Sequence, residues 1–129
     1  MSIKDKLQIL IVDDMSTSRG LISQALESQG LTNIHQAGDG SEALKILNSR
    51  PIHLVLSDFN MPGMDGLSLL AKIRGNSVIK SIGFILITGR ADKAIIDRGK
   101  SLGMNNFIKK PFTPGELKAC IEAVVGKIT

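Results

Sequence analysis

The segment that decides the fold reads Leu54-Val55-Leu56-Ser57-Asp58-Phe59-Asn60-Met61-Pro62-Gly63-Met64-Asp65-Gly66. An apolar run from Ile52 stops at the carboxylate of Asp58, and a loop with one proline and two glycines follows. A short, unbroken, β-prone run is typical of a strand that is buried on both faces. Asp58 is then predicted at the carboxyl end of a central strand, the edge where open parallel sheets bind ligands. A turn aspartate is the alternative for this residue taken alone.

The composition limits the classes of protein and of partner. A chain of 129 residues with 43% hydrophobic and 22% charged residues is typical of one globular domain. Four Phe and no Trp or Tyr predict an aliphatic core and disfavour a surface that stacks on nucleic-acid bases. The net charge of +4 comes from basic residues that form no long run, so no nucleic-acid partner is predicted.

The single cysteine and the N-terminal segment indicate the cellular compartment. Cys120 lies in an apolar helical pattern, which predicts a buried inert thiol and excludes a disulfide framework. Residues 1–6 are charged and lack the apolar core of a secretion signal, and no apolar stretch approaches membrane-spanning length. We therefore expect a cytoplasmic protein with no membrane insertion.

Strand and helix patterns alternate five times along the chain. The predicted strands are Leu7–Val12, Asn33–Ala37, Ile52–Ser57, Phe84–Ile87 and Phe107–Lys109. The predicted helices are Met15–Gln29, Ser41–Asn48, a helix from the N-cap Asp65 to Gly75, Ala91–Leu102, and Thr113–Val125 with Pro114 at its first position. This alternation predicts one α/β domain over residues 1–129, a doubly wound parallel sheet with helices on both faces, and no output domain.

Four predicted strands end in reactive groups, namely Asp13-Asp14, Asp58, Thr88 and Lys110. In a parallel sheet these ends share one edge, so the groups are expected in one crevice. Each pair of carboxylates at roughly 4 Å repels by about 1 to 4 kcal/mol, so such a site must bind a cation or keep a proton. Mg²⁺ suits this oxygen-rich set. Zinc is disfavoured, because the edge carries no His or Cys to bind it. Lys110 and Thr88 are the donors that a phosphoryl group needs.

Four sequence motifs in this order carry a family resemblance. They are Val12-Asp13-Asp14 with Ser18-Arg19, the segment Asp58–Gly66, Thr88-Gly89, and Lys110-Pro111-Phe112. With them the whole chain resembles the receiver domain of two-component response regulators, and most of all the CheY family of single-domain chemotaxis regulators. The resemblance implies a flavodoxin-like (βα)5 fold with strand order 2-1-3-4-5.

The same resemblance implies a role for each matching residue. Asp58 would be the 4-aspartylphosphate acceptor, while Thr88 and Lys110 would contact the phosphoryl oxygens. Mg²⁺ would be bound by Asp14, Asp58 and the backbone carbonyl of Asn60, and by Asp13 through water. The switch residues would be Thr88 and Phe107, the Lys110–Pro111 bond would be cis, and the partner face would include Lys93, Phe107, Lys109 and Lys118.

The resemblance also implies the activity and the partners. The domain would take up phosphate stoichiometrically and lose it slowly by itself, without the turnover of an enzyme. Its phosphodonor would be a chemotaxis histidine kinase, and its phosphorylated form would bind a target such as the flagellar motor switch. A phosphatase is expected as a further partner, and the protein is expected to be a monomer. Arg19, on the first long helix, is expected at the surface rather than in the site.

Two other functions fit the predicted architecture. A flavodoxin-like FMN-binding protein needs a phosphate cradle after the first strand, and Ser16–Ser18 offers one weakly, but adjacent Asp13 and Asp14 would repel a phosphate. A Mg²⁺-dependent phosphohydrolase with an aspartyl nucleophile usually has that nucleophile after the first strand, with a second aspartate two residues later. In this chain the two aspartates are adjacent.

Overall fold

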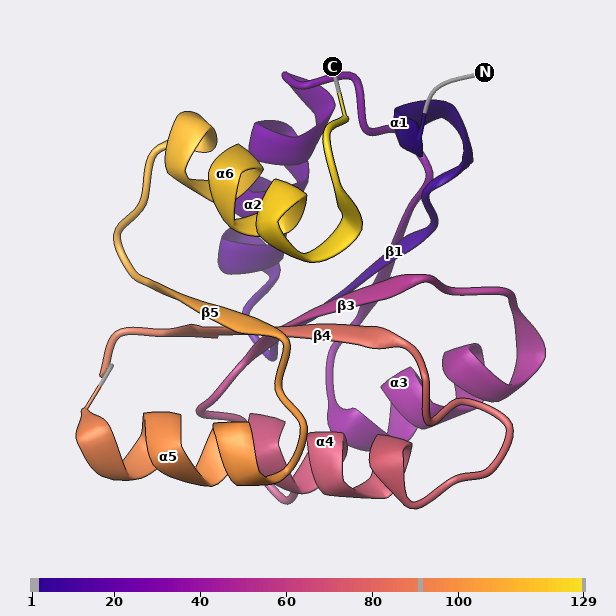
Figure 1. Cartoon of the computed structure of the whole chain (residues 1–129), viewed down its shortest axis with the longest axis vertical. Helices are drawn as coiled ribbons and strands as arrows, with labels where there is room; N and C mark the ends of the chain where they lie inside the picture. Colours follow the sequence, from indigo (N-terminus) through magenta and orange to yellow (C-terminus); the bar gives the residue numbers. More distant parts are fainter. Residues whose placement is uncertain (1–2, 91, 129) are drawn as a thin grey trace.

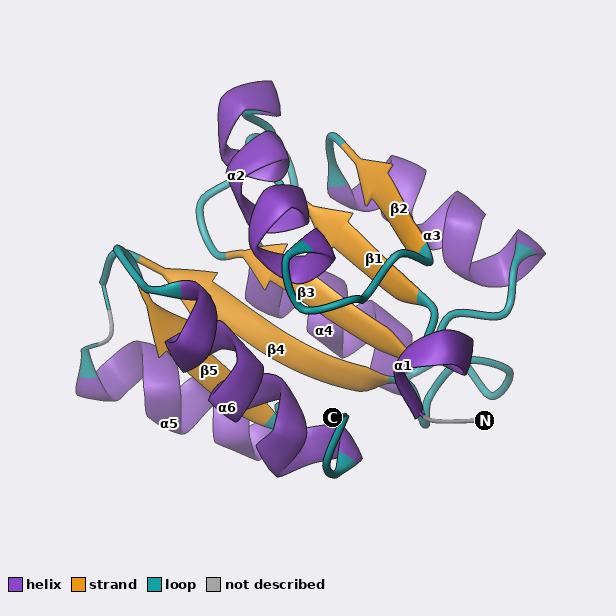
Figure 2. Ribbon diagram, turned by 90° about the horizontal axis from the view of Figure 1, so that it is seen from above, coloured by secondary structure: helices purple, strands orange, loops and turns teal. Residues whose placement is uncertain are grey.

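The sheet has five parallel strands in the order β2-β1-β3-β4-β5 (Figure 2). A computed structural model of the chain describes residues 3–90 and 92–128. The strands are β1 (Ile9–Val12), β2 (Ile34–Ala37), β3 (Leu54–Asp58), β4 (Gly83–Thr88) and β5 (Asn106–Lys109). The predicted fold class and strand order are confirmed.

Helices cover both faces of the sheet (Figure 1). One face carries α2 (Ser16–Glu27) and α6 (Pro114–Val125); the other carries α3 (Gly40–Ser49), α4 (Gly66–Arg74) and α5 (Lys93–Ser101). A short helix that the sequence did not predict, α1 (Ile3–Lys6), precedes β1. Four residues are too few to display a helical period. Within the described part of the chain, no helix is long and apolar enough to cross a membrane.

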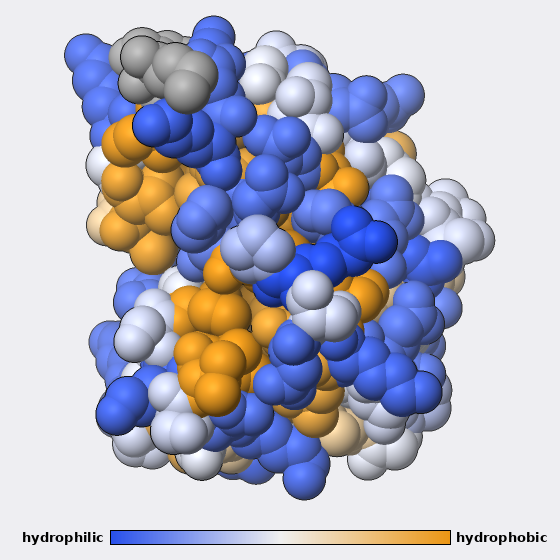
Figure 3. Space-filling view, turned by 90° about the vertical axis from the view of Figure 1, so that its right-hand side faces the viewer, coloured by the Kyte–Doolittle hydropathy of each residue, from blue (hydrophilic) through white to orange (hydrophobic). Residues whose placement is uncertain are grey.

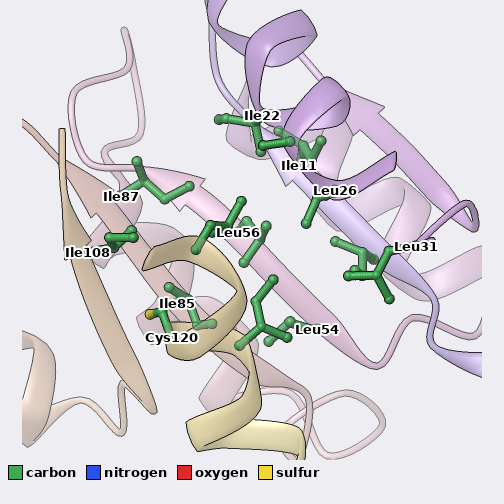
Figure 4. Packing of buried hydrophobic residues seen from close by; sticks show 14 of the residues in the cluster. Ile11, Ile22, Leu26, Leu31, Leu54, Leu56, Ile85, Ile87, Ile108 and Cys120 are labelled. Carbon is green, nitrogen blue, oxygen red and sulfur yellow. The ribbon is translucent and has the colours of Figure 1, made fainter. Parts of the chain in front are cut away.

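Alternate residues of each strand feed two separate hydrophobic clusters. Ile9 and Ile11 of β1 belong to the cluster under α2 and α6, whereas Leu10 and Val12 belong to the cluster under α3, α4 and α5. Figure 4 shows the first cluster, in which strand side chains point toward those of α2 and toward Cys120 of α6. Cys120 is buried as predicted, and burial raises the pKa of its thiol to about 11.

Helix caps fix the boundaries that the sequence indicated. Asp65 accepts a hydrogen bond from the Ser68 amide, and Thr113 caps α6 in a capping box. The helix predicted from Ala91 begins instead at Lys93, behind the cap Asp92; Ala91 itself lies outside the described residues.

The apolar residues of α2 and of its N-cap, Met15, are not all buried. Met15 and Leu21 are 61% and 64% exposed, whereas Ile22 and Leu26 are buried. The side of the molecule where α1 and α3 lie is mainly hydrophilic, with separate apolar patches (Figure 3).

Candidate functional site

The strand register brings the predicted reactive groups to one edge of the sheet. Val12 lies beside Ser57, Asp58 beside Ile87, and Thr88 beside Lys109. Asp13, Asp58, Thr88 and Lys110 therefore come from the carboxyl ends of four strands that are consecutive in the sheet, β1, β3, β4 and β5. Segments nearly a hundred residues apart in the sequence meet here.

Three carboxylates form a cluster at this edge. Asp13, Asp14 and Asp58 each offer an oxygen, and these oxygens lie within 4.8 Å of one another. Asp13 is buried, Asp58 is half-buried and Asp14 is exposed. The Lys110 ammonium lies 3.5 Å from Asp13 Oδ2 and 3.4 Å from Asp58 Oδ1. The predicted convergence of acids and lysine is thus present.

Asp13 accepts hydrogen bonds from three residues of the segment that follows it. Its Oδ1 accepts a hydrogen bond from the Met15 amide (3.0 Å), and its Oδ2 accepts one from Ser18 Oγ (2.5 Å). The Arg19 guanidinium donates to the Asp13 backbone carbonyl (2.6 Å). The prediction that Arg19 is only a surface residue is therefore wrong.

Asp58 sits between opposing electrostatic influences. Its Oδ1 accepts a hydrogen bond from the Phe59 amide (2.9 Å) and faces Lys110. Burial raises the pKa of the Asp58 carboxyl above its usual 3.8; Lys110 opposes the rise, and the negative charge of Asp13 adds to it.

Thr88 is fully buried, and its hydroxyl is engaged by the loop that follows β4. Thr88 Oγ1 accepts a hydrogen bond from the Arg90 amide (2.9 Å) and donates to the Arg90 carbonyl (3.3 Å). Asn60 is exposed in the loop after β3. The Lys110–Pro111 peptide bond is cis, as the resemblance implied.

The residues of the predicted partner face differ in exposure. Lys93 forms an exposed ion pair with Asp97 at 2.7 Å, and Lys109 is exposed on β5. Lys118 is partly buried, and Phe107 is half-buried against the cluster under α3, α4 and α5.

The donor set fits a hard divalent cation. Three carboxylates and one ammonium leave two negative charges, which a divalent ion balances. Oxygen ligands suit Mg²⁺. The Asp14 carboxylate makes no hydrogen bond or ion pair with any described residue, so it is free to bind an ion, whereas both oxygens of Asp13 already accept hydrogen bonds.

Comparison with known proteins identifies the family. The model of the response regulator receiver domain matches residues 9–122. The chain belongs to the response regulator receiver family. A probable chemotaxis protein CheY from Rhizobium etli is 48% identical over 128 residues, 99% of each chain. A chemotaxis protein CheY from Pseudomonas aeruginosa is 37% identical over 95% of this chain and 98% of the relative.

Solved structures of receiver domains have the same fold. The chemotaxis protein CheY4 of Vibrio cholerae aligns with a TM-score of 0.86 at 29% identity, over 92% of this chain and 98% of that one. A putative response regulator from Chloroflexus aurantiacus aligns with a TM-score of 0.87 at 26% identity, over 94% and 98% of the two chains. Receiver domains generally bind Mg²⁺ in an acidic pocket, and the carboxylate cluster of this receiver domain has the composition of such a pocket.

Two contacts at the site of this receiver domain were missed by reasoning from the sequence. Ser18 and Arg19 both lie in the first turns of α2 and reach back to Asp13. The sequence holds a weak indication of these contacts, because Ser18 and Arg19 follow Asp13 by five and six residues, in the helix that comes directly after the same strand. Their direction depends on how α2 is set against β1, which the sequence pattern does not reveal.

Proposed function

We propose that this receiver domain accepts a phosphoryl group on Asp58 from a phosphohistidine of a chemotaxis histidine kinase. The observation that carries the proposal is the position of the half-buried Asp58 beside Lys110, with a 3.4 Å separation between charged atoms. The Phe59 amide holds Oδ1, so the second carboxylate oxygen is the nucleophile.

The transfer exchanges one phosphorus bond for another. A carboxylate oxygen of Asp58 bonds to phosphorus as the phosphorus–nitrogen bond to the imidazole breaks, and the imidazole leaves with the electron pair. The product is an acyl phosphate on Asp58. Lys110 stabilises the negative charge of the transferred oxygens, and Thr88 donates to one of them once its hydroxyl leaves Arg90. Water later hydrolyses the acyl phosphate, which gives slow self-dephosphorylation.

The residues that would hold Mg²⁺ follow from the hydrogen bonds. Asp14, Asp58 and the backbone carbonyl of Asn60 would bind the ion directly, and Asp13 would bind it through water. Support for this division comes from the Asp14 carboxylate, which makes no hydrogen bond with a described residue, and from the Asp13 carboxylate, each oxygen of which already accepts one. When bound, the ion supplies positive charge that offsets the phosphoryl oxygens.

The output is proposed to be docking of the phosphorylated form onto a partner. Movement of Thr88 toward the phosphoryl group frees space into which Phe107 turns, and this changes the face formed by α5, β5 and α6. Lys93, Lys109 and Lys118 on this face attract an acidic segment of the partner. The relatives named as chemotaxis proteins support a role in chemotaxis. The target that we propose is the flagellar motor switch, with a phosphatase as a further partner.

Intact mass after incubation with Mg²⁺ and acetyl phosphate tests the acceptor. We expect a gain of one phosphoryl group in the parent protein, none in Asp58→Asn, and none after chelation. Asp97→Asn is the matched control, because this exposed carboxylate lies on α5 away from the site and should leave the gain intact. A gain that persists in Asp58→Asn contradicts the acceptor, and steady release of phosphate from a simple ester would favour a phosphohydrolase.

The docking face needs a separate measurement. Reversal of the charge at Lys109 and at Lys118, each to Glu, should weaken binding of the phosphorylated protein to a motor-switch peptide without reducing uptake of phosphate. Unchanged binding by both variants would remove these lysines from the interface.

A further inference from the structure

The hydroxyl of Ser18 connects two charged groups of the site. Ser18 Oγ donates to Asp13 Oδ2 at 2.5 Å, and it accepts a hydrogen bond from Lys110 Nζ at 3.5 Å. The same ammonium lies 3.5 Å from Asp13 Oδ2 and 3.4 Å from Asp58 Oδ1. Lys110 is thus shared among three oxygen atoms, and only the hydroxyl of Ser18 is neutral.

The two carboxylates compete for this lysine. The side chain of Asp13 is 1% exposed and that of Asp58 is 13% exposed, so the attraction to Asp13 is less screened by water. The hydrogen bond from Ser18 stabilises part of the negative charge of Asp13 and so weakens the attraction between Asp13 and the Lys110 ammonium. Ser18 Oγ also gives Nζ a neutral acceptor at 3.5 Å, so the ammonium is not drawn onto Asp13 alone.

We infer that Ser18 is a positioning residue that keeps the Lys110 ammonium between Asp13 and Asp58, ready for the phosphoryl oxygens. The inference rests on the proposed function of Asp58 as phosphoacceptor and adds a residue to that site. Without the hydroxyl, Lys110 moves fully onto Asp13 and has to be withdrawn from it before it can reach a phosphoryl group.

A purely structural role makes a different prediction. If the Ser18–Asp13 hydrogen bond only fastens the start of α2 to the end of β1, then its loss lowers stability and leaves binding at Asp58 unchanged. Affinity for beryllofluoride, a mimic of the phosphoryl group, separates the two roles, because it measures the stabilisation of charge at Asp58 directly.

The first experiment measures beryllofluoride affinity by ¹⁹F NMR at saturating Mg²⁺. We expect Ser18→Ala to weaken this affinity about fivefold, the effect of one typical hydrogen bond. Ser18→Thr, which keeps the hydroxyl, should stay near the parent, and Ser18→Cys, which keeps the volume but bonds weakly, should resemble Ser18→Ala. Mg²⁺ affinity without beryllofluoride is measured first in all four proteins, because Ser18 and Lys110 both contact Asp13, and each beryllofluoride titration is then run at a Mg²⁺ concentration that saturates that variant. Equal beryllofluoride affinity in the parent and both hydroxyl-free variants would overturn the inference.

A double-mutant cycle tests the route of the effect. In a Lys110→Ala background, Ser18→Ala should cause no further loss of beryllofluoride affinity, because the lysine that Ser18 positions is gone. A full additional loss would mean that Ser18 acts through Asp13, and it would also overturn the inference.

The same data separate the inference from the proposed function. Beryllofluoride affinity that survives Asp58→Asn contradicts the proposed function itself. Loss in Asp58→Asn together with normal affinity in Ser18→Ala contradicts only the role of Ser18. Thermal unfolding of each variant verifies that the protein is folded, and Ser18→Thr and Ser18→Cys keep the test available if Ser18→Ala does not fold.

Discussion

The ammonium of Lys110 lies 3.4 Å from Asp58 Oδ1, although β4 separates the strands from which the two residues come. The centres of two strands on either side of a third are roughly 10 Å apart, and the long lysine side chain spans this distance. The ion pair therefore ties together the ends of β3 and β5 and sets the charge at the proposed phosphoacceptor.

Removal of this lysine should raise the pKa of Asp58 further. Lys110 is the principal group that lowers this pKa against burial and Asp13, so Lys110→Ala leaves only the influences that raise it, apart from the Phe59 amide. A pH titration followed by the ¹³C NMR signal of the Asp58 carboxyl should show a higher midpoint than in the parent. Lys109→Ala, which removes the exposed neighbouring lysine, is the control and should not move the midpoint.

Asp58→Asn should stabilise the protein at neutral pH in the absence of a divalent cation. A carboxyl whose pKa is raised by folding stabilises the native state while it is protonated, and this contribution is lost as pH rises through the folded pKa. Asp58→Asn removes the cost of burying this charge and its repulsion from Asp13, which together outweigh the lost attraction to Lys110, and the net gain at neutral pH is about 1 kcal/mol.

The advantage of Asp58→Asn over the parent should shrink as the pH falls toward the ordinary carboxyl value of 3.8. Urea denaturation in chelator from pH 7 to pH 4 measures it. An advantage that grew toward acidic pH would contradict the direction of the shift.

Magnesium should stabilise the folded receiver domain, because the three carboxylates come together only when the sheet is formed. An ion at about a hundred times its dissociation constant adds about 2.7 kcal/mol to the free energy of unfolding. Thermal unfolding with and without Mg²⁺ should show a Tm increase in the parent that is abolished in Asp14→Asn. The increase should persist in Asp97→Asn, and equal increases in all three proteins would place the ion elsewhere.

Two glycines form a matched pair that tests the packing beneath the site. A Cβ on Gly66 would collide with the backbone carbonyl of Asp58 and would lie 3.0 Å from Leu86 Cδ1, both in the sheet. Gly66→Ala should therefore lower stability by about 2 kcal/mol and weaken Mg²⁺ binding, because the end of β3 has to shift.

Gly20 lies within α2, and apart from its chain neighbours and the backbone of its own helix no described atom lies within 4 Å of the added carbon, so Gly20→Ala should stabilise the helix by about 0.5 to 1 kcal/mol. Urea denaturation measures both changes. A Gly66→Ala protein as stable as the parent would show that the strand end is compliant.

Much of this molecule could be predicted because its strands are buried on both faces. Continuous apolar runs such as Leu54–Leu56 mark strands, and the alternation with helices then determines which strand ends meet. The same logic predicts that Asp13, Asp58 and Lys110 lie together at one edge of the sheet.

What could not be predicted depends on side-chain direction and on short local structure. Met15 and Leu21 are apolar but exposed, because the period of a helix does not specify where its buried face begins. The contacts of Ser18 and Arg19 with Asp13 depend on the angle at which α2 leaves β1. The helix α1 has only four residues and so leaves no periodic signal.

The separation of the site residues along the chain has a consequence for synthesis. Asp13 and Asp14 leave the ribosome early, Asp58 leaves near the middle, and Lys110 leaves after most of the 129 residues have been made. A nascent chain that lacks β5 holds its carboxylates without the ammonium that balances them. On the proposed function, a chain without β5 lacks the ammonium at Asp58, so we expect competence as a phosphoacceptor to appear only after the last strand joins the sheet.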